Sequence, residues 1–117
     1  SSASNEPPPP MTVAVWQDGG ARLWTMIRVP AVQWRPRRID PSVREQPVRP
    51  FGERDAEFDT IIEVLDVRTG ALLASQRYSQ YFVGNLNDDL VYSLRGTEDG
   101  DLRIDIWRIG LETNRRG

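Results

Sequence analysis

Short runs of β-branched and aromatic residues, separated at close intervals by turn sequences, most constrain how this chain can fold. The clearest turns lie at residues 17–20, 68–70 and 98–101, where glycine follows Asp, Gly or Thr. Such residues are typical of hairpin connections. No window combines apolar residues at helical spacing with capping residues at its ends. The sequence therefore predicts an all-β fold: an antiparallel meander of about seven strands, with no helix longer than about two turns.

The first hairpin is predicted over residues 12–29 and is ended by Pro30. Five more strands are predicted at residues 60–67, 71–78, 81–85, 90–95 and 102–111. Residues 61–65 are apolar at every position except Glu63, so both faces of this strand are expected to be covered. Stacked sheets bury both faces, as in a sandwich or a propeller. The short turns of the meander favour propeller-like blades.

Proline divides the chain into a tail and a β domain. Residues 1–11 end in a proline run and are predicted to form an extended tether. Residues 12–111 form the β domain, interrupted at 30–57 by a long irregular insertion in which prolines recur among arginines. Residues 112–117 are predicted to be a polar tail.

The composition excludes most familiar enzyme chemistry. The chain of 117 residues has no His and no Cys, and all 15 of its basic side chains are Arg. It therefore has no Ser-His or Cys-His pair, no His- or Cys-ligated metal and no Schiff-base lysine. The net charge of −2 also argues against a nucleic-acid-binding protein. We expect a protein that is not an enzyme and that has no cofactor, no metal site and no nucleic-acid partner.

Carboxylates were the remaining candidates for chemistry. The acidic segments at 87–89 and 98–101 are interpreted as hairpin turns and not as Ca²⁺ loops, because no closing Glu follows. A hydrolytic pair drawn from Glu63, Asp66 and Asp105 would need a deep cleft between the two groups. Asp105 lies between two isoleucines, so we expect it to be half-buried in an ion pair with an arginine such as Arg103 or Arg108.

The insertion carries the candidate binding site. Seven arginines and three acidic residues lie between residues 28 and 54, together with a tryptophan. Arginine and tryptophan often provide the binding energy of protein interfaces, and proline lowers the entropy lost when an extended segment docks. The alternatives are a solvated loop, a lipid-binding segment and a nucleic-acid-binding segment. The predicted partner-binding residues are Trp34, Arg35, Arg37, Arg38, Arg44 and Arg49. By contrast, Trp24 and Trp107 lie within apolar strands and are expected to be buried in the core.

Several segments together resemble a known family. They are residues 15–24 (VWQDGGARLW), residues 58–66 (FDTIIEVLD) with Thr69-Gly70, Gly84, residues 88–92 (DDLVY) and residues 104–108 (IDIWR). Over residues 13–111 the chain resembles the C-terminal two-blade portion of six-bladed β-propellers of the NHL/TolB-like type, found in many exported bacterial proteins. The resemblance implies one complete blade and three strands of a second, whose fourth strand is missing. A family site built from all six blades has no counterpart here, so it supplies no site residues.

These inferences together predict a non-catalytic structural or accessory subunit that binds other proteins in a larger assembly. That assembly could be membrane-associated, with this chain at its periphery and without a membrane span of its own. The alternative is a self-assembling partial propeller, in which three two-blade units form a ring that binds a sugar or another small ligand. The Ser- and Pro-rich start is typical of exported proteins after processing, so the expected location is extracytoplasmic, periplasmic or exported.

Overall fold

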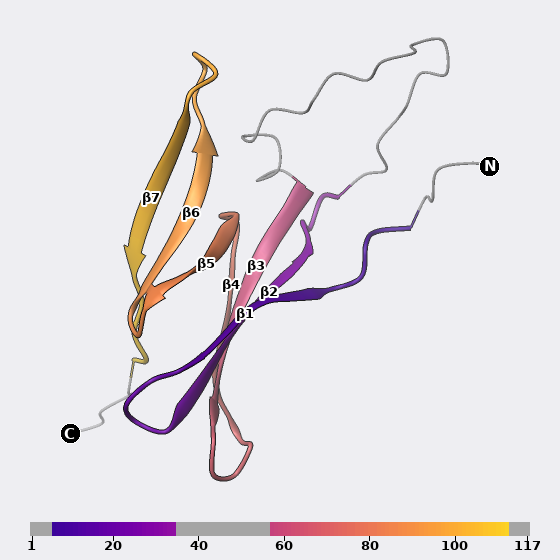
Figure 1. Ribbon diagram of the computed structural model, residues 1–117. Coiled ribbons are helices and arrows are strands. Elements are labelled where there is room, and N and C mark those ends of the chain that lie inside the picture. The colour runs from indigo at the N-terminus through magenta and orange to yellow at the C-terminus, as the bar shows by residue number, and fades with distance from the viewer. Residues whose placement is uncertain (1–5, 35–56, 113–117) are drawn as a thin grey trace.

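The computed structural model describes residues 6–34 and 57–112, which form an all-β fold (Figure 1). Its seven strands follow one another in antiparallel order, as the sequence predicted. The strands are β1 (Met11–Gln17), β2 (Arg22–Pro30), β3 (Phe58–Asp66), β4 (Leu72–Tyr78), β5 (Phe82–Asn87), β6 (Leu90–Gly96) and β7 (Leu102–Arg108).

The strands form two sheets, each a simple meander. The first contains four strands in the order β1-β2-β3-β4, and the second contains three in the order β5-β6-β7. The last strand was predicted to reach residue 111 but ends at Arg108. It pairs with β6, which begins at Leu90, and the final bond runs from the Ile109 N–H to the Asp89 carbonyl (2.8 Å). Residues 110–112 therefore have no residue of β6 opposite them with which to form a strand pair.

Local chemistry explains the tight turns that separate the strands. Gly70 and Gly100 adopt positive φ angles of 74° and 85°, a conformation that glycine allows without steric cost. In the β3–β4 turn, a carboxylate oxygen of Asp66 accepts the Arg68 N–H at 2.8 Å. In the β5–β6 turn, the side-chain oxygen of Asn87 accepts the Asp89 N–H at 3.3 Å. The acidic segments at 87–89 and 98–101 are therefore turns, as predicted.

One small core joins the two sheets. The rings of Trp16 and Trp24 stack with centroids 6.1 Å apart, on the side of the first sheet that faces the second. The Thr60 hydroxyl connects the sheets at another point, because it donates to the Gln80 carbonyl (2.9 Å) and accepts the Phe82 N–H (3.2 Å). The buried core cluster consists of Trp16, Trp24, Met26, Ile62, Val64, Phe82 and Val91.

Each sheet has one buried and one open face. In β3, Ile62 and Val64 point into the core, whereas Ile61 and Leu65 on the opposite face are only half-buried. The expectation that both faces of this strand are covered is therefore wrong for the described chain. Within residues 6–34 and 57–112 the stack contains two layers, so each sheet has a neighbouring sheet on one side only (Figure 1).

The two tryptophans predicted to be buried differ in their surroundings. Trp24 lies in the second strand of its sheet and is 4% exposed, which confirms the prediction. Trp107 is 39% exposed, so its predicted burial is wrong. Its ring packs edge-on against Phe82, and its indole N–H donates to Ser93 at 2.8 Å. Because β7 is the last strand of its sheet, none of the described strands covers the other side of this ring.

Candidate protein-binding site

The outer face of the three-stranded sheet presents a row of uncovered aliphatic side chains. Directly opposed residues of an antiparallel pair share a face, and Leu94 lies opposite Ile104 while Tyr92 lies opposite Ile106. Ile104 and Ile106 are 61% and 62% exposed. We refer to this surface as the apolar face, and it consists of Leu90, Tyr92, Leu94, Leu102, Ile104 and Ile106.

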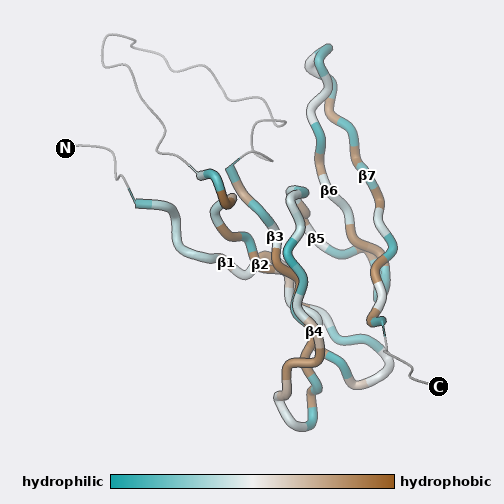
Figure 2. Tube along the Cα trace, turned by 180° about the vertical axis from the view of Figure 1, so that it is seen from behind, coloured by the Kyte–Doolittle hydropathy of each residue, from teal (hydrophilic) through white to brown (hydrophobic). Residues whose placement is uncertain are grey.

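The apolar face is nearly free of charge. Among the described residues of its rows, the one charged side chain is Arg108 at its end, and that side chain pairs with Asp89. On β5, a methyl group added to Gly84 would lie 3.5 Å from the Tyr92 ring, so this ring covers the glycine and broadens the face. Figure 2 shows hydrophobic stretches along β6 and β7 on this part of the molecule. A contiguous exposed apolar surface of this kind is typical of interaction sites.

The outer face of the four-stranded sheet is also partly apolar, with Leu72 56% exposed, but the row at its centre is polar. Its central row runs across the strands from Val15 through Thr25 and Glu63 to Ser75. Glu63 is half-buried and has no ion-pair partner among the described residues. The hydroxyl of Thr25 is buried without a hydrogen-bond partner. Covering this row with an apolar partner would bury an unpaired carboxylate, which is costly.

A buried carboxylate organises the β1–β2 turn. Asp18 accepts hydrogen bonds from the Gly20 N–H (2.8 Å), from Nε of Arg22 (2.9 Å) and from the indole N–H of Trp24 (2.8 Å). Burial by itself raises the pKa of Asp18, but the bonds from Trp24, Gly20 and Arg22 outweigh it, so the pKa lies below its ordinary value of 3.8. All of these donors come from the same hairpin. The arrangement therefore stabilises the turn and the stacked tryptophans.

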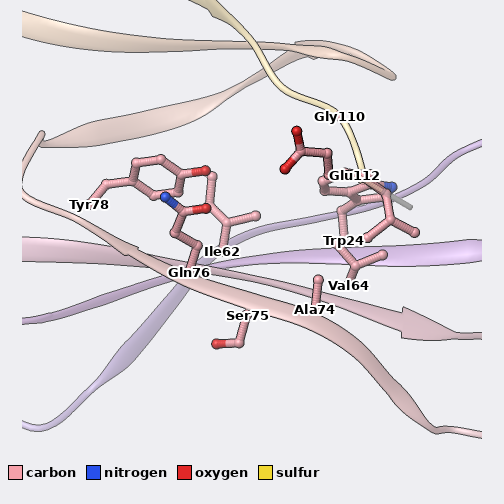
Figure 3. Close-up of a pocket in the computed structure, with 10 residues that line it drawn as sticks. Trp24, Ile62, Val64, Ala74, Ser75, Gln76, Tyr78, Gly110 and Glu112 are labelled. Carbon is pink, nitrogen blue, oxygen red and sulfur yellow. The ribbon is translucent and has the colours of Figure 1, made fainter. Parts of the chain in front are cut away.

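A groove of about 330 Å³ lies between the four-stranded sheet and the residues that follow β7 (Figure 3). Its floor is apolar, and Gln76, Tyr78 and Glu112 place polar groups around it. The Ser75 side chain points to the opposite side of β4 from Gln76, so its hydroxyl does not face the groove. The lining residues include amide, phenol and carboxylate groups, without a nucleophile held against a base.

The insertion leaves the first sheet through a closed neck. Beyond the Pro30–Phe58 pair, the Ala31 N–H donates to the Glu57 carbonyl at 2.9 Å, so both ends of the insertion are held side by side. Beside the neck, the Arg28 guanidinium lies over the rings of Phe58 and Tyr81, at 5.6 and 4.4 Å from their centroids. These contacts fix the position from which the insertion starts.

The predicted partner-binding residues are placed only in part. Trp34 follows the neck, is half-exposed, and donates its backbone N–H to the Ala31 carbonyl at 2.9 Å. Its predicted role in partner binding stays a prediction. The other residues of this prediction lie outside the described residues: Arg35, Arg37, Arg38, Arg44 and Arg49.

The candidate carboxylates do not form one site. Glu63 and Asp66 belong to β3 in the first sheet, whereas Asp105 belongs to β7 in the second. Asp105 is half-buried and paired with an arginine, as expected. The arginine is Arg95 (3.1 Å), which lies on the neighbouring strand, and not one of the two examples from its own strand. Within residues 6–34 and 57–112, no group of three or more potential ligands could hold a metal ion.

Comparison with known proteins identified no relative: no family model, no curated protein and no solved structure matches this chain. Of the expected propeller architecture, the structure shows two antiparallel meanders, of four and three strands. Within the described ranges, no helix is long and apolar enough to cross a lipid bilayer.

Sequence reasoning missed the apolar face. The alternation in residues 102–106, where Leu102, Ile104 and Ile106 are separated by Arg103 and Asp105, was present in the sequence. It indicated a strand with one apolar face. What the sequence did not reveal is that the core lies on the other face of this strand, where Trp107 contacts Phe82.

Proposed function

We propose that this protein is a non-catalytic accessory subunit that binds another protein through the apolar face of its three-stranded sheet. The observation that carries the proposal is the exposure of Ile104 and Ile106 beside Leu102, on a face without a central charge. Burying a half-exposed aliphatic side chain of this size contributes roughly 1 kcal/mol. Several such side chains on one flat surface favour a protein partner over a small ligand.

The proposal also concerns the setting of the complex. The Ser- and Pro-rich N-terminal sequence supports an extracytoplasmic assembly, which could be associated with a membrane through its other subunits. The insertion at the neck provides a second contact region in this proposal, with Trp34 and the arginines that follow it as its anchors.

The test compares two leucines on the outer faces of the two sheets. Leu94→Glu places a charge in the apolar face, whereas Leu72→Glu places one at an exposed position of the other outer face. The tagged chain and both variants are purified from the native cells, and partners are quantified by mass spectrometry. We expect one stoichiometric partner that is lost with Leu94→Glu and kept with Leu72→Glu. A wild-type chain without such a partner, or equal retention by both variants, would contradict the proposal.

A second candidate is the self-assembling partial propeller of three two-blade units, with a small-ligand site. The stacking of a complete four-stranded meander on a three-stranded one supports it, because neighbouring propeller blades stack in this way. Head-to-tail assembly would place the apolar face against the row that contains Glu63, so an unpaired carboxylate would be buried. A trimer mass in sedimentation equilibrium is the result this candidate requires.

A further inference from the structure

One edge of the three-stranded sheet is formed by β7, which among the described strands pairs with β6 only. Figure 1 shows β7 as the outermost strand of this sheet, away from the four-stranded sheet. The backbone groups on the other side of such a strand are available to pair with another strand. The edge strand β4 of the other sheet carries Arg77, whose side chain turns inward and donates to Asp59 and to the Pro30 carbonyl, both at 2.7 Å.

The side chains along β7 are complementary to those of a second copy of the same strand. When two copies run antiparallel with Ile104 opposite Ile104, Arg103 of each copy lies opposite Asp105 of the other. In the same register Leu102 lies opposite Ile106, so aliphatic residues meet on the apolar face. Each charged residue meets its opposite on the other face.

Neighbouring registers lack this match. Moving the centre to Asp105 places two carboxylates opposite one another, and moving it to Arg103 places two guanidinium groups opposite one another. A shift that changes the face brings aliphatic side chains of one copy against the charged side chains of the other. The register centred on Ile104 is therefore favoured over those on either side of it.

The charge balance within one copy also favours a second copy. Arg103 lies directly opposite Arg95 on the neighbouring strand, and like charges in such a pair are destabilising. Asp105 pairs with Arg95, and Arg103 has no ion-pair partner among the described residues. In the antiparallel pairing, Asp105 of the second copy lies opposite this unpaired Arg103. Charges on an edge strand usually discourage pairing, but these alternate in sign and attract in this register.

We propose that two copies of this chain associate by antiparallel pairing of their β7 strands around Ile104, which joins the two three-stranded sheets. This inference goes beyond the proposed function, because the partner is a second copy and the contact is the strand edge. The two-fold axis is perpendicular to the joined sheet, so the apolar faces of both copies lie on the same side. The interaction is self-complementary, as closed two-fold dimers require.

Cysteine substitutions test the register directly, because the chain contains no natural cysteine. In the proposed dimer the two Ile104 Cα atoms lie about 5 Å apart, within the range that a disulfide bridges. Ile106 of one copy lies opposite Leu102 of the other, so the two Ile106 positions are offset by four residues along the strands. This offset separates them by about 13 Å along the strand direction. Ile106 is the matched control, since the two isoleucines are equally exposed. Under mild oxidation we expect Ile104→Cys, and not Ile106→Cys, to form a covalent dimer on non-reducing gels.

Charge reversal tests the ion pairs. Arg103→Asp and Asp105→Arg each create like-charge contacts with a second copy of the same variant. We expect each to weaken self-association at least about tenfold in sedimentation equilibrium. A mixture of the two variants restores opposite charges at both positions and should form the mixed dimer. These side chains lie on the face opposite Leu94, so partner binding through the apolar face should be retained.

Three outcomes would overturn the proposal. The first is equal cross-linking of the two cysteine variants, or none in either. The second is a wild-type chain that stays monomeric or forms a trimer across the concentration range. The third is a mixture of charge variants that associates no better than each variant alone. The loss of a heterologous partner in the Leu94→Glu experiment does not bear on any of these results.

Discussion

The two sheets are built on the same meander but differ in how their edges and outer faces end. The four-stranded sheet ends at β4, where Arg77 connects three strands through Asp59 and the Pro30 carbonyl, and its outer face has a polar centre at Glu63. Both edge strands expose aliphatic side chains, Leu72 on β4 and Ile104 on β7, but the outer face beside β7 has no charge at its centre. The comparison teaches that the same meander topology does not determine whether a sheet can bind a partner. Binding depends on which side chains occupy the last strand and the uncovered face.

The largest expected effect separates the tryptophans of the two sheets. Trp24→Ala should lower the free energy of unfolding by about 3–5 kcal/mol, because a fully buried ring is lost. Trp107→Ala should lower it by about 1–2 kcal/mol, because part of its ring is already in water. Urea unfolding followed by circular dichroism measures both. If Trp24→Ala does not fold, Trp24→Phe removes the bond to Asp18 and should still cost more than Trp107→Phe. Equal losses of stability for the Trp24 and Trp107 variants would show that the two tryptophans contribute equally, contrary to their difference in burial.

An intermediate effect is expected from the buried carboxylate of the first sheet. Asp18→Asn should reduce stability at pH 7 by about 1.5–3 kcal/mol, the range for hydrogen bonds to a charged group. The folded pKa of Asp18 lies below its ordinary value of 3.8, so its stabilisation is complete above that value. It is lost as the pH falls through the lowered pKa, and the difference between variant and wild type should shrink there. Asp99→Asn, in the β6–β7 turn, is the control and should leave stability at pH 7 within about 0.5 kcal/mol of wild type.

The smallest effect compares the two sheet edges. Arg77→Met should lower stability by about 1 kcal/mol, because the partly buried Asp59 and the Pro30 carbonyl lose a donor. Arg108→Met, which removes an exposed pair with Asp89, should change it by less than about 0.5 kcal/mol. Thermal unfolding at low protein concentration measures both without a contribution from association. A larger loss at Arg108 would mean that the β7 side of the second sheet is the more firmly fixed one.

The strands and turns of this chain were predictable because their causes are local. Gly70 and Gly100 occupy turn positions with positive φ, and alternating residues mark each strand around them. The end of β7 was not predictable from its own residues, because it depends on where β6 begins at Leu90. The same holds for Asp105, whose partner Arg95 comes from the neighbouring strand. Pairings of this kind follow from register, and register depends on the whole sheet.

The candidate site was less predictable than the fold. The sequence directed attention to Trp34 and the arginines of the insertion, of which the described structure contains Trp34 alone. Strand runs such as residues 102–106 look alike whether they face a core, a partner or water. To decide which face such a strand turns to the core, one has to know which residues form the core. In this chain the core cluster includes Phe82 and Val91 of the second sheet, whereas Ile104 and Ile106 are exposed. This depends on how the two sheets stack, which single strands do not encode.

The neck formed by Ala31 and Glu57 has a consequence for the evolution and engineering of this chain. Because both ends of the insertion meet in a hydrogen-bonded pair, the length between them does not affect the register of β2 and β3. Loop-closure entropy grows only with the logarithm of length, so replacing residues 32–56 by a short turn would change the free energy of loop closure by only about 1.5 kcal/mol. The neck is therefore a site at which segments of different length and chemistry can replace one another while the register of the β-sheet is kept.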